Sequence, residues 1–223
     1  MYTHAMIGDR VIPKPYQTTA AEGLFALLCD HIRDRTVIAI AGESGSGKTE
    51  IAFELVRFFE GKKIPAVMFQ QDDYFFYPPK TNEAARRKSI KRVGLGEVNL
   101  RLLDEHMGHF KRTPQTTLQR PLVIFHENRV TRETIDPMAF EVAIVEGTYT
   151  SLLKNVDWRV FIDRSYKDTI DDRKERSRDT VDDFSERVLE LEHKIIVRHK
   201  TMAHIVVNND FSLTPVDMDE DRG

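Results

Sequence analysis

The sequence has few of the features that a secreted or membrane protein uses. Its one cysteine, Cys29, excludes an intramolecular disulfide, and its place among spaced apolar residues predicts a core-packing role. No apolar run approaches the length that a bilayer-spanning helix needs, and the N-terminus lacks the apolar stretch of a secretory signal. We therefore expect a cytoplasmic protein without a membrane partner.

An excess of charge of one sign is also missing. The 33 basic and 36 acidic residues leave a net charge of −3, so nothing global favours nucleic acid as a partner, and a small molecule fits better. The 223 residues are ample for one α/β domain and short for two, so we expect a single domain over residues 1–223. The oligomeric state is left open, a homo-oligomer included.

What the sequence does contain is a phosphate-binding pattern. Residues 42–49 read G-x-x-x-x-G-K-T between an apolar run at 36–41 and an amphipathic helix, the context of a P-loop. Backbone N–H groups of such a loop surround a phosphate chain, Lys48 reaches the β- and γ-phosphates, and the Thr49 hydroxyl ligates Mg²⁺. We therefore expect Mg²⁺ and ATP to bind here. The residues expected to hold the nucleotide are Gly42, Ser44, Gly45, Ser46, Gly47, Lys48 and Thr49.

The order of apolar segments predicts an α/β fold, a three-layer α/β/α P-loop NTPase with a mostly parallel sheet and a helical lid. Strands are expected at 36–41, 64–69, 140–145, 158–163 and 204–207, and a short strand or hairpin arm at 121–125. Helices are expected after a Thr19 cap, after the P-loop, at 83–92, at 100–110 and in two segments before the last strand. Residues 1–17 are expected to form an arm and 215–223 a disordered tail.

Acidic residues follow two of these strands, where a parallel sheet collects its ligands. Asp72 or Asp73 is a candidate to accept the proton of an attacking hydroxyl, although either acid could merely cap the following turn. Glu146 is a candidate second acid at the Mg²⁺ site, with a solvated strand-end glutamate as the alternative. Tyr149, close by, either lines a pocket or packs in the core.

A lid is expected over residues 165–180. The segment from Lys167 to Arg178 is helical in composition, yet Ile170 is its only sizeable aliphatic side chain, so no core face holds it. Its arginines suit a lid that closes over phosphates, with an ordinary exposed helix as the alternative. These arginines are Arg173, Arg176 and Arg178.

Two further groups of polar residues are candidates for contacts with the acceptor. A basic cluster most simply forms a solvated face, and if functional it would receive an anionic group of the acceptor. Its members are Arg86, Arg87, Lys88, Lys91 and Arg92. His126 and Arg129 could form polar walls of a substrate site, and a surface hairpin explains them almost equally well.

With the P-loop, Gln71-Asp72-Asp73-Tyr74-Phe75, Glu146-Gly147 and the arginine-bearing segment in this order, the chain resembles the uridine kinase / phosphoribulokinase family of P-loop kinases. The resemblance implies that Asp72 is the catalytic base, with Asp73 as second choice under another alignment. It also implies a magnesium-site acid at Glu146 and lid arginines that act on the transferred phosphate. The expected catalytic residues are Asp72, Lys48 and Arg173. The expected substrate-binding residues are Asp73, Tyr74, Phe75, Tyr77, Phe125, His126, Arg129 and Tyr149.

The acceptor half departs from uridine kinases. Their F-D-x-P and P-x-Y-D-F elements, which help to hold the nucleoside, are replaced here by residues 94–99 and 121–125. We expect an ATP-dependent small-molecule kinase with a nucleoside as its leading acceptor, and pantothenate, glycerate or a sugar phosphate as alternatives. A regulatory P-loop NTPase is the rival of another class, against which the missing N-K-x-D guanine-recognition motif counts.

Overall fold

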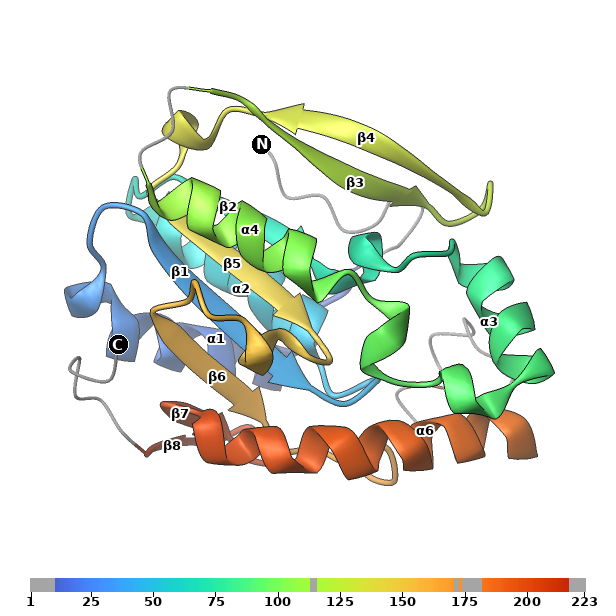
Figure 1. Cartoon of the computed structure of the whole chain (residues 1–223). Helices are drawn as coiled ribbons and strands as arrows, with labels where there is room; N and C mark the ends of the chain where they lie inside the picture. Colours follow the sequence, from blue (N-terminus) through green and yellow to red (C-terminus); the bar gives the residue numbers. More distant parts are fainter. Residues whose placement is uncertain (1–10, 113–115, 171–172, 174–181, 217–223) are drawn as a thin grey trace.

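The computed structural model describes residues 11–112, 116–170, 173 and 182–216. Its strands are β1 (Thr36–Gly42), β2 (Ala66–Gln70), β3 (Leu118–Ile124), β4 (Arg129–Ile135), β5 (Val142–Gly147), β6 (Trp158–Ile162), β7 (Ile205–Val207) and β8 (Leu213–Pro215). Six of them form one sheet in the order β2-β5-β1-β6-β7-β8 (Figure 1). The pairs from β2 to β7 are parallel and β8 is antiparallel, so the mostly parallel sheet is confirmed.

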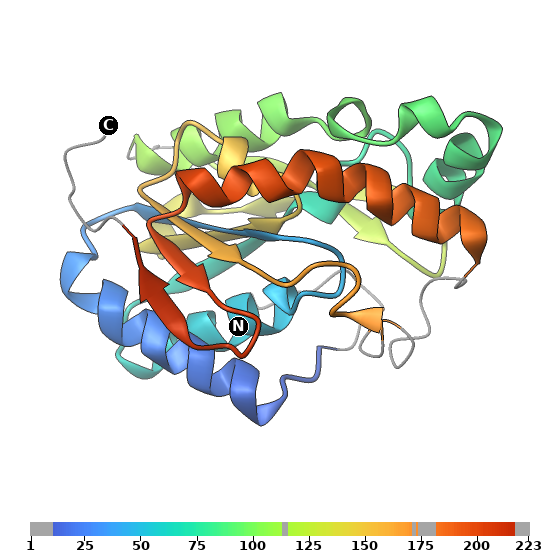
Figure 2. The same ribbon diagram turned by 90° about the horizontal axis from the view of Figure 1, so that it is seen from below.

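Helices cover both faces of this sheet. The α-helices are α1 (Pro15–Leu28), α2 (Lys48–Gly61), α3 (Pro79–Lys88), α4 (Leu100–Lys111) and α6 (Asp183–Ile196). Figure 2 shows α1 and α2 on one side of the sheet and α4 and α6 on the other. The 3-10 helices are η1 (Cys29–His31), η2 (Gln71–Tyr74), η3 (Ile90–Arg92), η4 (Leu95–Glu97), η5 (Pro137–Ala139), η6 (Thr150–Leu152) and η7 (Val197–Met202). No helix in the described part of the chain combines the length and the apolar character that crossing a bilayer requires.

The two layers of core follow from the alternation of side chains along buried strands. Every residue of β1 is buried, and successive side chains point to opposite faces. Ile38 and Ile40 therefore pack with α1 and α2, whereas Val37 and Ala39 pack with α4. The predicted three-layer α/β/α arrangement is confirmed.

The first helix begins earlier than the sequence suggested. We expected Thr19 to cap it, but Thr19 lies inside α1, where its hydroxyl donates to the Pro15 carbonyl at 3.1 Å. Pro15 occupies the first helical position, where its missing N–H and fixed φ cost nothing, and the Gln17 side chain accepts from the Lys14 N–H at 2.8 Å. Cys29 is half-buried just beyond this helix rather than in the core.

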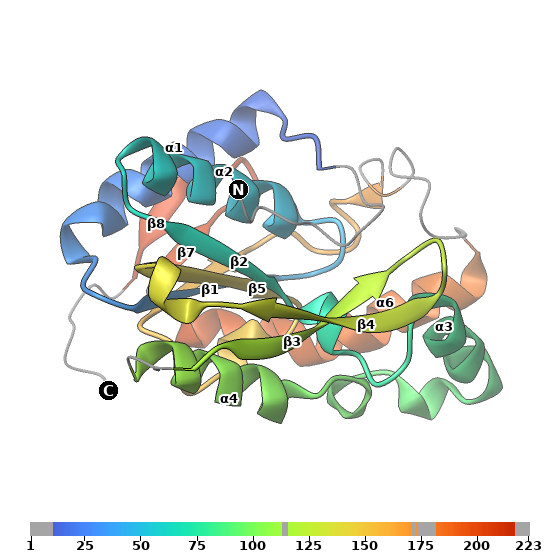
Figure 3. The same ribbon diagram turned by 90° about the horizontal axis from the view of Figure 1, so that it is seen from above.

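The hairpin arm is longer than residues 121–125. β3 and β4 form an antiparallel pair that lies beyond β2, the edge strand of the main sheet (Figure 3). The buried Arg120 of β3 connects this hairpin to the main sheet, because its guanidinium donates to the Met68 carbonyl of β2 and pairs with Glu133 of β4.

The last strand, β8, was not predicted, because it has only three residues and ends in proline. It pairs antiparallel with β7, from Val207 opposite Leu213 to Ile205 opposite Pro215. The first two residues of the tail expected at 215–223 are therefore ordered, since Pro215 ends β8 and the Val216 N–H donates to the His204 carbonyl at 2.8 Å. Residues 217–223, like residues 1–10 of the expected arm, lie outside the described part.

Candidate active site

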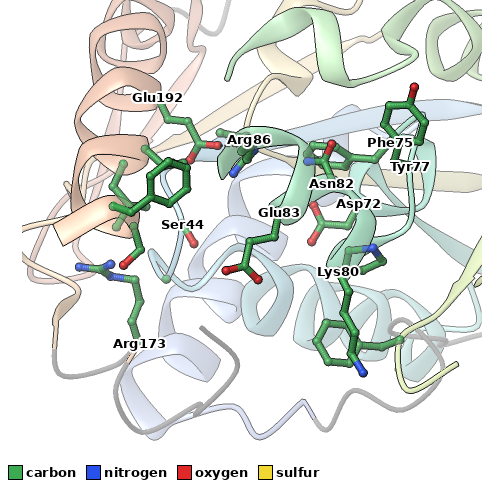
Figure 4. Close-up of a pocket in the computed structure, with 18 of the residues that line it drawn as sticks. Ser44, Asp72, Phe75, Tyr77, Lys80, Asn82, Glu83, Arg86, Arg173 and Glu192 are labelled. Carbon is green, nitrogen blue, oxygen red and sulfur yellow. Dashed lines mark hydrogen bonds and ion pairs between the residues drawn. The ribbon is translucent and has the colours of Figure 1, made fainter. Parts of the chain in front are cut away.

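The carboxyl ends of three neighbouring strands meet at one cavity. β5 lies between β1 and β2, and Glu146 stands opposite Ile40 on one side and Gln70 on the other. The P-loop follows β1 and Asp72 follows β2, so the polar groups after these strands come together as expected from the topology. They line a cavity of about 440 Å³ (Figure 4).

The P-loop forms the donor side of this cavity. Ser44, Gly45, Lys48 and Thr49 line it, while Gly42, Ser46 and Gly47 shape the turn behind them. Gly45 has φ +76°, and a Cβ there would lie 2.6 Å from the Arg173 side chain, so a larger residue would be strained and would have to displace Arg173. The Lys48 ammonium donates to the Glu43 carbonyl at 2.8 Å, which holds it at the mouth of the loop.

The two expected magnesium ligands lie in contact. The Thr49 hydroxyl donates to Glu146 at 3.1 Å, and the Gln70 amide donates to the same carboxylate oxygen at 2.9 Å. Burial raises the pKa of Glu146, the charge of Lys48 opposes that rise, and Asp72 adds to it. A hydroxyl and a carboxylate are hard oxygen donors of the kind that Mg²⁺ prefers, so the residues fit this ion.

Asp72 and Asp73 have different surroundings. Asp72 is exposed and lines the cavity (Figure 4). Asp73 is 4% exposed and turned to the hairpin, where its carboxylate accepts from the Val123 N–H at 2.7 Å, and burial raises its pKa to about 7. Of the two acids, Asp72 is thus the one that a substrate in this cavity would meet.

The acceptor side of the cavity has two walls. Phe75, Tyr77 and Phe125 line it, as the sequence suggested. α3 contributes Pro79, Lys80, Asn82, Glu83, Arg86 and Arg87, and the opposite wall from α6 contributes Phe184, Ser185, Val188, Leu189 and Glu192. The α6 wall was missed, although Phe184, Val188 and Glu192 recur every four residues and so share one face of a helix. An acid on an otherwise apolar face was the signal that could have found it.

Four expected substrate-binding residues lie outside the cavity besides Asp73. Tyr74 is buried, with its hydroxyl 2.8 Å from His106, and Tyr149 is buried with its ring near His199. His126 and Arg129 are exposed at the tip of the hairpin, where Arg129 pairs with a neighbouring glutamate. These positions fit the alternatives left open above, core packing for Tyr149 and a surface hairpin for His126 and Arg129, and a contact of the four residues with substrate stays a prediction.

Of the three expected lid arginines, the structure describes Arg173. Its side chain lines the cavity and donates to the Tyr166 carbonyl at 2.8 Å. Thr169, from the same segment, donates to the Ser44 carbonyl at 3.1 Å, so the start of the expected lid contacts the P-loop. Arg176 and Arg178 lie outside the described residues, as does most of the segment 165–180.

The basic cluster is not simply a solvated face. Arg86 is 16% exposed and pairs with Glu97 and Glu192, and Arg87 pairs with Glu83 and Asp182. The Arg92 guanidinium lies over the Tyr77 ring, while Lys88 and Lys91 are exposed. Arg86 is thus mostly buried and paired with carboxylates from outside its own helix, so the interpretation as a solvated face is wrong for this residue.

This chain is similar to several known proteins. A model described as the Phosphoribulokinase / Uridine kinase family matches residues 37–210. The bifunctional alpha-galactosidase/sucrose kinase AgaSK of Mediterraneibacter gnavus is 29% identical over 204 residues, 83% of this chain, and this chain spans only 21% of that longer protein. The uridine kinase of Leuconostoc citreum (strain KM20) is 26% identical over 204 residues, 82% of this chain and 91% of its own length.

A solved structure shares the fold. A possible uridine kinase from Bacillus stearothermophilus superposes with a TM-score of 0.57 at 18% identity, over 84% of this chain and 97% of its own. At this identity the likeness supports the fold alone.

Proposed function

Since this chain belongs to the phosphoribulokinase / uridine kinase family, we propose that it transfers the γ-phosphate of ATP to a hydroxyl group of a small molecule. One observation carries the proposal: Asp72 shares a cavity with Lys48 and Thr49 of the P-loop, with Glu146 and with Arg173. A nucleoside is the leading acceptor, because uridine kinases are among the relatives, and a sugar is the alternative that the sucrose kinase relative suggests.

The residues divide the work of the reaction. The P-loop N–H groups and Lys48 bind the triphosphate, and Asp72 accepts the proton of the acceptor hydroxyl as its oxygen bonds to the γ-phosphorus and ADP leaves. Arg173 adds positive charge where the transferred group becomes more negative. Phe75, Tyr77 and Phe125 bind the acceptor through their rings.

Thr49 and Glu146 would hold Mg²⁺, directly or through water. A bound Mg²⁺ would neutralise phosphate charge and orient the triphosphate for in-line displacement. A single domain over residues 1–223, a cytoplasmic location and the lack of nucleic-acid and membrane partners stay predictions of the sequence, as does a role for Arg176 and Arg178.

The matched variants Asp72→Asn and Asp73→Asn test the assignment of the base. Asp72→Asn should lower kcat by at least ~100-fold with little change in the KM for ATP, because it removes the proton acceptor and leaves the donor side intact. Asp73→Asn keeps an oxygen for the Val123 N–H and should retain turnover within a few-fold. Steady-state ADP release measures both. Near-normal turnover by Asp72→Asn would remove that residue from the role.

A further inference from the structure

The acceptor half of the cavity is apolar in part and closed by charged side chains. Phe75, Tyr77, Phe125 and Phe184 supply rings, and Val188 and Leu189 add aliphatic surface. The polar lining comes from facing sides of α3 and α6, where Asn82, Glu83 and Arg86 stand across from Glu192 (Figure 4). Which acceptor this half can bind therefore depends on the ion pairs that its charged side chains make with one another.

Arg86 is surrounded by carboxylate. Its Nε and Nη2 donate to the two oxygens of Glu97 at 2.6 and 2.9 Å, and Nη2 also donates to Glu192 at 2.8 Å. Burial alone would lower the pKa of Arg86, but the two carboxylates outweigh it and raise that pKa. Asn82 donates to Glu97 at 3.0 Å and completes the group. Burial raises the pKa of Glu192, and the charge of Arg86 opposes that rise. One guanidinium shared between two carboxyl groups leaves no unmatched positive charge in this network.

Arg87, the second arginine of this half, is matched in the same way. It donates to Glu83 of its own helix and to Asp182, the N-cap of α6, at 2.8 Å, and it lies over the Phe184 ring. Two arginines of α3 are thus tied to α6, and each carries two carboxylate partners. At either arginine, an anionic group would have to displace a carboxylate or face it unscreened. α3 also supplies Lys80 to this wall, but Lys80 is exposed, so water and salt screen its charge.

A neutral polyol meets a different environment. Its hydroxyl groups can donate to the Glu192 carboxylate, which lines the cavity, and its carbon skeleton can pack on the rings. Resting on the kinase function proposed above, we infer that the acceptor is a neutral polyhydroxylated molecule, a sugar or the ribose of a nucleoside. The Glu97–Arg86–Glu192 network selects it over phosphorylated or carboxylated analogues. Pantothenate, glycerate and sugar phosphates are accordingly disfavoured as acceptors.

Matched pairs of acceptors test the inference on the wild-type protein. Each pair differs by one anionic group: fructose and fructose 6-phosphate, glycerol and glycerate, pantothenol and pantothenate, uridine and 5-carboxyuridine. In a coupled ADP-release assay, the neutral member of each accepted pair should have a kcat/KM at least ~10-fold higher, one decade being 1.4 kcal/mol. The sugar and uridine arms distinguish the two sources of the polyol.

Each outcome has a distinct meaning. Preference for the anionic members would overturn the inference and leave the proposed function standing. ADP release that none of the compounds increases would contradict the proposed function, and the inference with it.

The variant Glu192→Gln assigns the selectivity to the network, and Glu190→Gln on the exposed side of α6 is its matched control. Glu192→Gln should raise the KM for the neutral acceptor at least ~10-fold, leave the KM for ATP unchanged and narrow the neutral-to-anionic ratio. Glu190→Gln should change none of these. An unchanged ratio in a folded Glu192→Gln protein would reduce Glu192 to a structural role, and the wild-type pairs decide the acceptor class even if that variant does not fold.

Discussion

Asp73 illustrates how a residue beside a catalytic candidate is separated from the chemistry. It follows Asp72 directly, but the 3-10 turn η2 directs the two side chains to different places, one to the cavity and one to the hairpin. Burial raises the pKa of Asp73 from 3.8 to about 7, with the Val123 N–H and the charge of Arg120 opposing the rise. This carboxyl therefore titrates close to neutral pH.

The pKa of Asp73 predicts a pH dependence of stability. Between pH 3.8 and about 7 the folded protein keeps a proton that the unfolded chain has lost, so the free energy of unfolding falls as the pH rises. At 1.36 kcal/mol per unit, the ionised form costs on the order of 4 kcal/mol above pH 7. As the pH rises from 5 to 8, the free energy of unfolding of Asp73→Asn should therefore increase by about 2–3 kcal/mol relative to that of the wild type, measured by urea unfolding. Parallel pH profiles of the two proteins would contradict this account.

β5 and η2 approach each other so closely that the backbone leaves no room for a side chain at residue 147. A Cβ on Gly147 would lie 2.2 Å from the Gln71 Cβ, and Gln71 is held in place because its side chain accepts from the Tyr149 N–H at 2.7 Å. Glycine is required here by this contact. It keeps Glu146, near the end of β5, and Asp72, just after β2, at one cavity.

Gly147→Ala should destabilise the protein by about 3 kcal/mol, the upper end of ordinary overpacking, because a shift of η2 would also disturb Asp72. Gly61→Ala is the control. Gly61 ends α2, and beyond its own neighbours in the helix no atom of the described residues lies within 4 Å of the added Cβ, so helix propensity predicts a gain of about 0.5–1 kcal/mol. Urea unfolding measures both. Equal stability of the two variants would show that the close approach is not a constraint.

The elements that sequence reasoning found are those whose pattern is local. β1 and β5 are unbroken apolar runs buried on both faces, and the P-loop is a contiguous motif. The full hairpin was missed because β3 contains the buried Arg120, whose partners Met68 and Glu133 are not adjacent in sequence. The local pattern around Glu192 shows an acid on an otherwise apolar helix face, but its partner Arg86 lies 106 residues away. A local pattern does not show which residue completes a long-range ion pair.

For the whole molecule, nucleotide binding should appear as stability. A ligand that binds only the folded state at 100 times its Kd adds about 2.7 kcal/mol, so Mg·ATP should raise the Tm of the wild type. Lys48→Ala should lose most of this increase, because it removes the cation expected on the β- and γ-phosphates. Lys194→Ala, on the exposed side of α6, is the control and should keep the increase. Equal shifts in all three proteins would count against the P-loop assignment.

The proposed reaction moves a phosphoryl group from ATP in the donor half of the cavity to an acceptor molecule in the other half. The most direct measurement follows the wild-type protein with Mg·ATP and each neutral acceptor, with ADP quantified and the acceptor analysed by mass spectrometry. We expect ADP release that depends on the acceptor and is matched by an equal amount of phosphorylated acceptor. Release of ADP and inorganic phosphate at the same rate with and without every acceptor would contradict it and would indicate a regulatory NTPase instead.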